Sequence, residues 1–387
     1  MKDKTETRQA EPRLACDLLE RFMRDALVAA GVPAADAALV ADVLIESDKR
    51  GIESHGIGRL KPIYLDRIDA GILNPVTSVE VVRDNLTAAV LDGHNGLGHV
   101  VGVRAMRLAI EKARTYGMGM VAVRHSTHYG IAGYYATMAT DAGLIGVTGT
   151  NARPSIAPTG GVENMLGTNP LTWGLPTDEP FPFVLDCATS VTQRGKIEVY
   201  GRAGQALPPG WVIGSDGRTR TDTAQVLQDL TTGQAALTPL GGIGEETAGY
   251  KGYGFATVVE ILSAALQEGA WMKALNGTDA DGKPAPYPLG HFFMAVNPGF
   301  FMGLETFKRI AGAICRELRA SRRMPGWERI YTAGEKEWEA RRERLAQGCP
   351  VPPALQRVLV EIRDRYRLPY RFAFEPPTSA AGNGCPS

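Results

Sequence analysis

The sequence has few cysteines, no net charge and no long apolar run. Its five cysteines, Cys16, Cys187, Cys315, Cys349 and Cys385, are widely scattered, a spacing that predicts neither a disulfide framework nor a thiolate metal site. Forty-two basic residues balance 42 acidic residues, so the chain as a whole is not expected to bind a polyanion. No apolar run reaches the ~18 residues of a membrane-spanning helix. We therefore expect neither nucleic acid nor a membrane as a partner.

The two ends of the chain are polar. The start, "MKDKTETRQAEPR", lacks the apolar core of a secretory signal peptide. Together with the scattered cysteines, this favours a reducing, cytoplasmic location. Residues 308–344 are rich in arginine, but glutamates alternate with the arginines and no aromatic stacking platform accompanies them. This pattern is typical of solvated, salt-bridged helices rather than of a nucleic-acid interface.

The apolar periodicity changes along the chain and predicts a mixed fold. Three helices are expected over 14–30, 35–48 and 60–70, and the chain is again helical from residue 304. Between them we expect a hairpin over 78–93, further helices over 100–116, 131–142 and 254–268, and strands at 118–124, 144–150 and 290–298. Two short buried strands are expected within 171–187. The fold class is therefore α/β (α+β), with a helical N-terminal segment rejoined by a helical C-terminal segment around a central mixed or antiparallel sheet.

A chain of 387 residues is expected to form two or three structural units. We predict a mainly helical domain from residues 1–78 plus 303–387, and a central domain over 79–302. The central region contains a glycine-rich turn, "LDGHNGLGHVVG", which is similar to the dinucleotide-binding fingerprint. The following strand does not end in the acidic residue that grips a ribose. We therefore expect no Rossmann fold and no pyrophosphate contact from Gly96 or Gly98.

The stretch "GIESHGIGRLKPIY" places Ser54, His55 and Arg59 close together. Histidine titrates near neutral pH and can exchange a proton, whereas the arginine fork suits a carboxylate. Gly56 and Gly58 would let a ligand approach the backbone. A solvated or ordinary core histidine remains the alternative for His55.

Two further histidines, His125 and His128, stand in "RHSTHYG" where a strand gives way to a helix, a usual position for site residues. A metal site built from this pair and a carboxylate would make the protein a metal-dependent hydrolase. The spacing matches no known zinc pattern, so we predict no metal.

Asp186 and Lys251 are the other candidate site residues. Asp186 ends the apolar run "PFVLD", where it either caps its own turn through Thr189 or Ser190 or orients a histidine. If that histidine is His55, the carboxylate would raise its pKa. Lys251, in "AGYKGYG", opens a helix near free backbone N–H groups, so it either holds phosphate oxygens or is simply solvated.

In this order, "SHGIGRL", "LDGHNGLGHVVG", "HSTHYG", "GTNP", "FVLDCATS", "YKGYG" and "AGEKE" resemble the motifs of one family, the malate/L-lactate dehydrogenases of the second type. Relatives in that family act on sulfolactate, ureidoglycolate, diketogulonate and cyclic imino acids. The resemblance extends over residues 14–368. It implies a nicotinamide cofactor, NAD or NADP, bound on a largely antiparallel, non-Rossmann sheet.

The resemblance also implies roles for individual residues. His55 would exchange the substrate hydroxyl proton with support from Ser54 and Asp186, and Arg59 would hold the carboxylate. His128 matches a second motif histidine that some members use as the base, and Thr159 is expected to contact the substrate. The residues expected to line the cofactor are Asp186, Ala188, Thr189, Lys251, Gly252, Gly334, Glu335 and Lys336.

The expected activity is therefore an NAD(P)-dependent interconversion of a small 2-hydroxy acid and its 2-oxo acid, of malate or lactate type. The alternative within the family is a reductase of a cyclic imino acid or a keto-sugar acid. The resemblance implies a homodimer with its active site near the subunit interface. Three positions depart from the family's pattern: His125 precedes Ser126, Tyr250 stands before the lysine, and "YTAGEKE" lacks the usual proline.

Overall fold

The computed structural model describes residues 12–376, and its centre is a seven-stranded sheet in the order β2-β3-β4-β10-β5-β6-β7. Strands β3 and β4 are parallel, and the other neighbouring pairs of this sheet are antiparallel. This arrangement confirms the predicted mixed sheet and differs from the parallel sheet of a Rossmann fold. The strands are β2 (Glu80–Asp84), β3 (Ala88–Asp92), β4 (Met118–Ser126), β5 (Ile145–Thr150), β6 (Leu171–Leu175), β7 (Phe183–Cys187) and β10 (Leu289–Val296).

Helices cover both faces of the sheet. Because side chains alternate along a strand, Phe292 and Phe293 of β10 point to opposite faces. Phe293 packs with helices α4 (Gly98–Tyr116) and α5 (Ala132–Asp141), whereas Phe292 packs with Val259 of α8 (Gly249–Ala264). Helix α8 begins five residues before the predicted start, which places Lys251 in its first turn.

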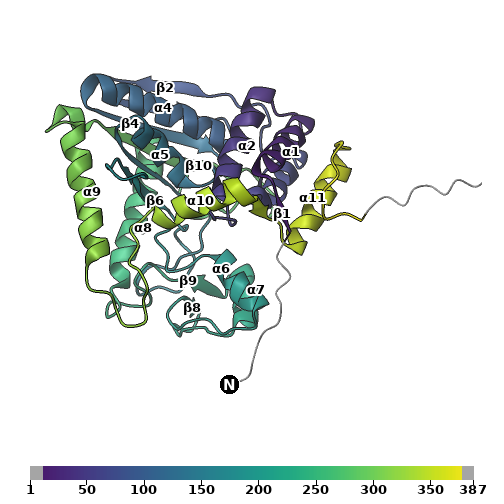
Figure 1. Cartoon of the computed structure of the whole chain (residues 1–387). Coiled ribbons are helices and arrows are strands. Elements are labelled where there is room, and N and C mark those ends of the chain that lie inside the picture. Colours follow the sequence, from purple (N-terminus) through teal and green to yellow (C-terminus); the bar gives the residue numbers. More distant parts are fainter. Residues whose placement is uncertain (1–11, 377–387) are drawn as a thin grey trace, which may run out of the picture.

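The two ends of the described chain share one hydrophobic core, as the sequence predicts. Helices α1 (Cys16–Ala29) and α2 (Ala34–Lys49) pack with α11 (Pro353–Arg365), and β1 (Arg13–Leu14) pairs with β11 (Cys349–Pro350). In Figure 1 these purple and yellow elements lie together at one side of the sheet.

Helix α9 (Leu304–Ala320) lies away from that core, and helix α10 (Glu335–Gln347) returns the chain to it. Helix α9 lies on the opposite side of the molecule from α1 and α11 (Figure 1), where Arg316 pairs with Asp178 and Glu179 of the central region. Helix α10 returns to α2 through Arg341, which pairs with Glu46 at 2.8 Å. The predicted division into two domains stays a prediction, and α9 contacts the central part of the chain.

A smaller layer between residues 194 and 237 packs with Ile156, Leu166 and Ala256 in a separate hydrophobic core. The sequence patterns do not predict the elements of this layer. It comprises α6 (Arg194–Arg202), β8 (Val212–Gly214), α7 (Thr223–Thr232) and β9 (Ala235–Leu237). Short helical turns complete the fold: η1 (Ile57–Arg59), η2 (Leu60–Leu65), α3 (Asp66–Asp69), η3 (Ala265–Gln267), η4 (Met272–Leu275) and η5 (Pro298–Phe300). The predicted regular helix over 60–70 is in fact a wide π-type turn that runs into α3.

The prediction that β6 and β7 are buried is wrong for one face of these strands. Trp173 and Leu185 are cross-strand partners, and these residues are 39% and 40% exposed. The reason is topological, because β7 is the edge strand of the sheet and α8 packs over β5 and β10 instead. An apolar pair is therefore open on the surface.

Candidate functional site

The loop that carries Ser54 and His55 is anchored on the end of α2. The buried Asp48 carboxylate accepts a hydrogen bond from the Ile57 N–H at 2.7 Å. A Cβ atom on Gly56 would lie 2.1 Å from Asp48 Oδ1, so glycine is required there for packing. Burial, with a smaller contribution from Glu53, raises the pKa of Asp48 to about 7 against the opposing hydrogen bond from Ile57 and the charge of Arg344. The Arg344 guanidinium, from α10, also holds this loop by contacting the Asp48 carbonyl and the Glu53 carboxylate.

His55 stacks on His128, with ring centroids 5.6 Å apart and ring planes 18° apart. His55 Nδ1 lies 2.9 Å from Ser54 Oγ. Burial, with a smaller contribution from Arg59, lowers the pKa of His55 to about 4. Burial is also the main cause that holds the pKa of His128 well below its ordinary value, followed by the charges of the neighbouring histidines and arginines. Both rings are therefore neutral at pH 7.

The predicted pairing of Asp186 with His55 is not formed in this structure. The Asp186 carboxylate accepts hydrogen bonds from the Gly133 N–H at 2.7 Å and from the Thr172 hydroxyl at 3.0 Å. No hydrogen bond or ion pair within residues 12–376 joins it to His55. The pKa of His55 is consequently lowered, not raised, because its surroundings supply burial and a cation instead of a carboxylate. The predicted cap through Thr189 or Ser190 is not formed either, since Asp186 bonds across to β6 and α5.

The hydrogen bonds around His128 assign its tautomer. The Gly130 N–H, which can only donate, lies 3.3 Å from His128 Nδ1, and Tyr64 Oη lies 2.5 Å from the same nitrogen. Nδ1 is therefore the acceptor, and the neutral ring carries its proton on Nε2. Tyr64 Oη, having donated, accepts from His99 Nε2 at 3.2 Å. This leaves His99 Nδ1 as a buried acceptor without a partner among residues 12–376.

Arg59 lies at the start of the wide helical turn that also carries Tyr64. Its Nε donates to the Ser54 carbonyl, which fixes the guanidinium beside His55. Across residues 12–376, no carboxylate pairs with Arg59. Its two terminal nitrogens are thus available for an external anion, the geometry that bidentate carboxylate recognition requires.

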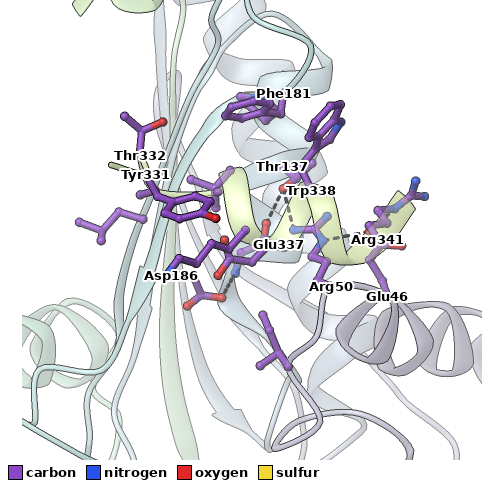
Figure 2. Close-up of a pocket in the computed structure, with 18 of the residues that line it drawn as sticks. Glu46, Arg50, Thr137, Phe181, Asp186, Tyr331, Thr332, Glu337, Trp338 and Arg341 are labelled. Atoms are coloured by element: carbon purple, nitrogen blue, oxygen red, sulfur yellow. Dashed lines mark hydrogen bonds and ion pairs between the residues drawn. The ribbon is translucent and has the colours of Figure 1, made fainter. Parts of the chain in front are cut away.

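A cavity of about 590 Å³ lies beside this loop, between α2, α5, β7 and the start of α10. Figure 2 shows Phe181 and Trp338 at the top of the view, Tyr331 and Asp186 at the left and Arg50 at the right. The segment from His128 to Gly133 connects the two regions. Gly130 contacts the His128 ring, and Gly133 donates to Asp186 at the cavity wall. Burial raises the pKa of Asp186, although part of its side-chain surface remains open to the cavity.

Three of the residues predicted to bind the cofactor meet in this cavity: Asp186, Gly334 and Lys336 line it. Gly334 has φ +89°, and a Cβ there would lie 3.0 Å from the Pro182 carbonyl oxygen. Glu335 instead points into the protein, where it accepts a hydrogen bond from the Thr332 N–H at 3.0 Å and pairs with Arg319 and Arg329.

The remaining predicted residues lie outside that cavity. The half-buried Ala188 leads to Thr189, whose carbonyl accepts from the Leu240 N–H at 2.8 Å. A Cβ on Gly252 would lie 2.2 Å from the Leu240 carbonyl oxygen, so Gly252 packs against the same residue. The exposed Lys251 lies 5.8 Å from the Tyr250 ring centroid. Thr159, in the connection between β5 and β6, has a buried hydroxyl with no hydrogen-bond partner in the described part of the chain.

The glycine-rich turn at residues 93–102 serves packing. The Gly96 N–H donates to the Gly93 carbonyl at 2.8 Å, and the Gly98 N–H donates to Thr127 Oγ1 at 3.0 Å. Both donors are therefore occupied within the protein, and the absence of a pyrophosphate contact at Gly96 and Gly98 stays a prediction. His125 from the alternative metal pair instead bonds Asp92 at 2.9 Å. The described part of the chain contains no group of three or more His, Cys, Asp or Glu side chains arranged to hold a metal, and none of its helices is long and apolar enough to cross a membrane.

Sequence reasoning missed Tyr64 and His99 as site residues. Both are fully buried, and each sits in a motif that was singled out for other residues. A tyrosine at helical spacing from Leu60 is predicted to be an ordinary core residue. Only the tertiary contact between its hydroxyl and His128 indicates a role in the site. Arg50 and Arg341 of the cavity were also missed. Arg341 belongs to the charged C-terminal run that predicts a solvated helix, whereas its Nε pairs with the buried Glu46.

The chain is similar to known proteins over most of its length. The malate/L-lactate dehydrogenase family matches residues 14–360. A malate dehydrogenase from Pyrococcus horikoshii is 44% identical over 91% of this chain and 95% of its own length, and an L-sulfolactate dehydrogenase from Methanocaldococcus jannaschii is 38% identical over 91% and 94%. The crystal structure of malate dehydrogenase from Entamoeba histolytica superposes with a TM-score of 0.90, at 42% identity, over 94% of this chain and all of that one. The chain belongs to the malate/L-lactate dehydrogenase family.

Proposed function

We propose that this protein is an NAD(P)-dependent dehydrogenase that interconverts a small 2-hydroxy acid of malate or lactate type and its 2-oxo acid. The observation that carries the proposal is the stacked pair of neutral histidines beside Arg59, an arginine with no carboxylate partner among residues 12–376. Oxidation of a 2-hydroxy acid needs a base for the hydroxyl proton and a cation for the carboxylate. The names of the similar malate and sulfolactate dehydrogenases support the same reaction class.

The cavity beside the histidines fits a nicotinamide cofactor. Its volume of about 590 Å³ lies within the usual range for cofactor sites, and it combines aromatic walls with the cationic Lys336. Asp186, Gly334 and Lys336 would hold the cofactor there, and the nicotinamide, when bound, supplies the hydride acceptor. Ala188, Thr189, Lys251, Gly252 and Glu335 remain proposed cofactor residues on the strength of the family motifs alone.

The hydrogen bonds assign the proton position of His128 and leave that of His55 free to follow Ser54, and this difference supports different roles. Neutral His128 carries its proton on Nε2, so this nitrogen donates a hydrogen bond and cannot accept the hydroxyl proton. His55 is held through Nδ1 by Ser54, whose hydroxyl can accept as well as donate. When Ser54 accepts, His55 Nε2 has a free lone pair and serves as the base. Arg59 binds the carboxylate, and His128 orients the substrate oxygen.

Thr159 remains a proposed substrate contact. Its buried hydroxyl lacks a partner within the described chain, as expected of a group whose hydrogen-bond partner is a bound ligand. Asp186 acts on the site by holding the N-terminus of α5, and thereby the His128–Gly133 segment, through its hydrogen bond from Gly133.

We further propose a homodimer. Helix α9 exposes Ile310, Ile314 and Leu318 at successive helical turns, and the open face of the sheet exposes Trp173 and Leu185. Exposed apolar side chains that recur along one helix or lie paired on a sheet are typical of subunit interfaces. Size-exclusion chromatography with light scattering at assay concentration tests this, and a fully active monomer would contradict it.

The activity itself is tested by following the loss of reduced-cofactor absorbance with NADH and with NADPH across a panel of 2-oxo acids. We expect turnover with oxaloacetate or pyruvate and a preference for one cofactor. The alternative is a reductase of a cyclic imino acid or a keto-sugar acid. A delta1-piperideine-2-carboxylate reductase from Pseudomonas syringae shares this fold at 25% identity and a TM-score of 0.78. Turnover of a cyclic imine with no turnover of any 2-oxo acid would favour that alternative.

A further inference from the structure

Arg67 is a second arginine without a carboxylate partner near the proposed site. It lies one helical turn after Tyr64, whose hydroxyl bonds His128 at 2.5 Å. The neighbouring carboxylates are taken by other cations, because Asp66 pairs with Lys61 and Arg365, and Asp69 also pairs with Arg365. Among residues 12–376, Arg67 forms no ion pair and donates no hydrogen bond.

The guanidinium of Arg67 is nevertheless held in place. Its Cζ lies 4.1 Å from the centroid of the Tyr287 ring, a cation–π contact. Tyr287 packs so closely on Gly277 that a Cβ at that position would lie 2.1 Å from the ring. A fixed, half-buried cation without a counter-charge is costly unless a ligand supplies the anion.

A second cation, Arg153, lies near Arg67. Burial is the main cause that lowers the pKa of Arg67; Tyr287 and Tyr64 oppose it, and the nearby charge of Arg153 adds a smaller lowering. Both Arg59 and Arg67 lower the pKa of His128, so the ring of His128 lies within the field of two unpaired arginines. A monocarboxylate bound by Arg59 would carry no second anionic group to neutralise the charge of Arg67.

We infer that Arg67 determines substrate specificity by receiving a second acidic group, a carboxylate or a sulfonate, at the far end of a 2-hydroxy or 2-oxo acid bound to Arg59. This inference rests on the proposed function and sharpens it. The preferred substrate carries two acidic groups, as a four-carbon dicarboxylate does, and lactate-type monocarboxylates are the poorer substrates. Tyr287 positions the guanidinium by stacking on it.

The test compares oxaloacetate with 2-oxobutanoate, which has the same number of carbons and lacks the second carboxylate. Wild type, Arg67→Gln and Arg67→Lys are assayed with both. We expect Arg67→Gln to lower the ratio of kcat/KM values, oxaloacetate over 2-oxobutanoate, by roughly 10- to 100-fold, the usual worth of a charge-assisted hydrogen bond. Arg67→Lys should recover part of that ratio. Arg21→Gln, which removes an exposed arginine of α1, is the matched control and should leave the ratio unchanged.

The outcomes separate this inference from the proposed function. Wild type that reduces no 2-oxo acid contradicts the function. Wild type that reduces both substrates equally well, or an Arg67→Gln variant that slows both in the same proportion, overturns the inference and leaves the function standing. Binding gives a second readout. Malate should raise the Tm of wild type more than 2-hydroxybutanoate does, and Arg67→Gln should abolish that difference.

A separate observation concerns the thiols of Cys16 and Cys349. Their sulfur atoms lie 3.0 Å apart in the core where β1 meets β11, only about 1 Å more than a disulfide bond length. The residues are 333 positions apart in sequence, so a bond between them would tie the start of α1 to the C-terminal segment. Cross-links that close long loops constrain the unfolded chain most strongly.

We propose that Cys16 and Cys349 form a disulfide when the protein is exposed to a small disulfide oxidant such as oxidised glutathione. One protein thiolate attacks the oxidant and releases one glutathione thiol. The second protein thiolate then displaces the other, so the protein is oxidised by two electrons and the oxidant is reduced to two thiols. Both thiols are buried and burial raises the pKa of Cys349, so the exchange is slow and follows local opening of β1.

Peptide mapping after prolonged incubation with oxidised glutathione tests this proposal. We expect a linked Cys16–Cys349 peptide and a higher Tm, both reversed by dithiothreitol. Cys315→Ser should behave as wild type, and Cys16→Ser should lose both effects. Recovery of both thiols in alkylatable form, or a glutathione adduct without the linked peptide, would overturn the proposal.

Discussion

His55 and His128 come from segments more than 70 residues apart, yet their imidazole rings lie almost parallel with centroids 5.6 Å apart. Each ring is held by a hydroxyl group, His55 by Ser54 and His128 by Tyr64. The difference between these hydroxyls decides what each histidine can do. Tyr64 donates to His128 because the Gly130 N–H already identifies Nδ1 as an acceptor, whereas Ser54 is free to reverse its role.

The first prediction concerns Tyr64→Phe, which removes the hydroxyl and keeps the ring. His128 then loses the hydrogen bond from Tyr64 to Nδ1, which favours the tautomer protonated on Nε2. We expect kcat to fall about 10-fold, which corresponds to the loss of one hydrogen bond, and KM to change less. Histidine side-chain ¹⁵N NMR should show His128 Nε2 as the protonated nitrogen in wild type and a mixture of tautomers in the variant.

Tyr370→Phe is the matched control, because Tyr370 also donates one hydrogen bond, at 2.6 Å to Asp25, but lies in the helical core away from the histidines. It should leave kcat and the tautomer unchanged. An unprotonated His128 Nε2 in the wild-type spectrum would refute the tautomer assignment.

The second prediction concerns Arg59→Lys, which keeps the charge and loses the fork. We expect a loss of about 2–4 kcal/mol in transition-state stabilisation for every 2-oxo acid, since a bidentate pair at a desolvated site becomes a single contact. The measurement is kcat/KM with oxaloacetate and with 2-oxobutanoate. Unchanged efficiency with both substrates would remove Arg59 from the site.

The third prediction concerns Asp48, whose pKa is raised to about 7 in the folded protein from an ordinary value near 3.8. The folded state then binds more protons than the unfolded state between these values, so this contribution to stability is full below pH 3.8 and is lost as pH rises through 7. Asp48→Asn removes the titration. The variant should gain about 1–3 kcal/mol relative to wild type between pH 5 and pH 8.

Urea unfolding at a series of pH values measures this difference. Asp281→Asn, at an exposed loop position, is the control and should leave the pH dependence as it is in wild type. A constant difference between Asp48→Asn and wild type across the series would mean that Asp48 stays ionised in the folded protein.

Much of the architecture could be predicted from the sequence, because apolar periodicity reports which face of an element is buried. The helices at both ends, the hairpin at Asp84 and most central strands follow from it. The exposed pair Trp173 and Leu185 does not, since an edge strand and a central strand can have the same composition. The sequence predicts a regular helix for the turn that carries Tyr64. The wider π-type turn depends on tertiary contacts, which the local sequence does not report.

The sequence predicted which residues belong to the candidate site better than it predicted their hydrogen-bond partners. Ser54, His55 and Arg59 are neighbours in sequence, and they remain neighbours in the structure. Asp186 is distant in sequence, and the chain alone could not show that its carboxylate would bind Gly133 and Thr172 instead of a histidine. Because Asp186 does not pair with His55, the pKa of His55 is lowered and not raised as predicted.

The central claim is that His55 accepts the hydroxyl proton, and the pH dependence of kcat/KM for 2-hydroxy acid oxidation tests it most directly. His55→Ala should lower kcat/KM by about 10²- to 10⁴-fold at pH 7. Because substrate ionisation is common to both enzymes, the ratio of wild type to His55→Ala isolates the histidine. That ratio should be constant above pH 5 and fall below it, since the base is lost as His55 protonates with a pKa of about 4. His128→Ala should retain this acid limb. If His128→Ala removes the limb and His55→Ala keeps it, the proton acceptor is His128, and the account given for His55 is wrong.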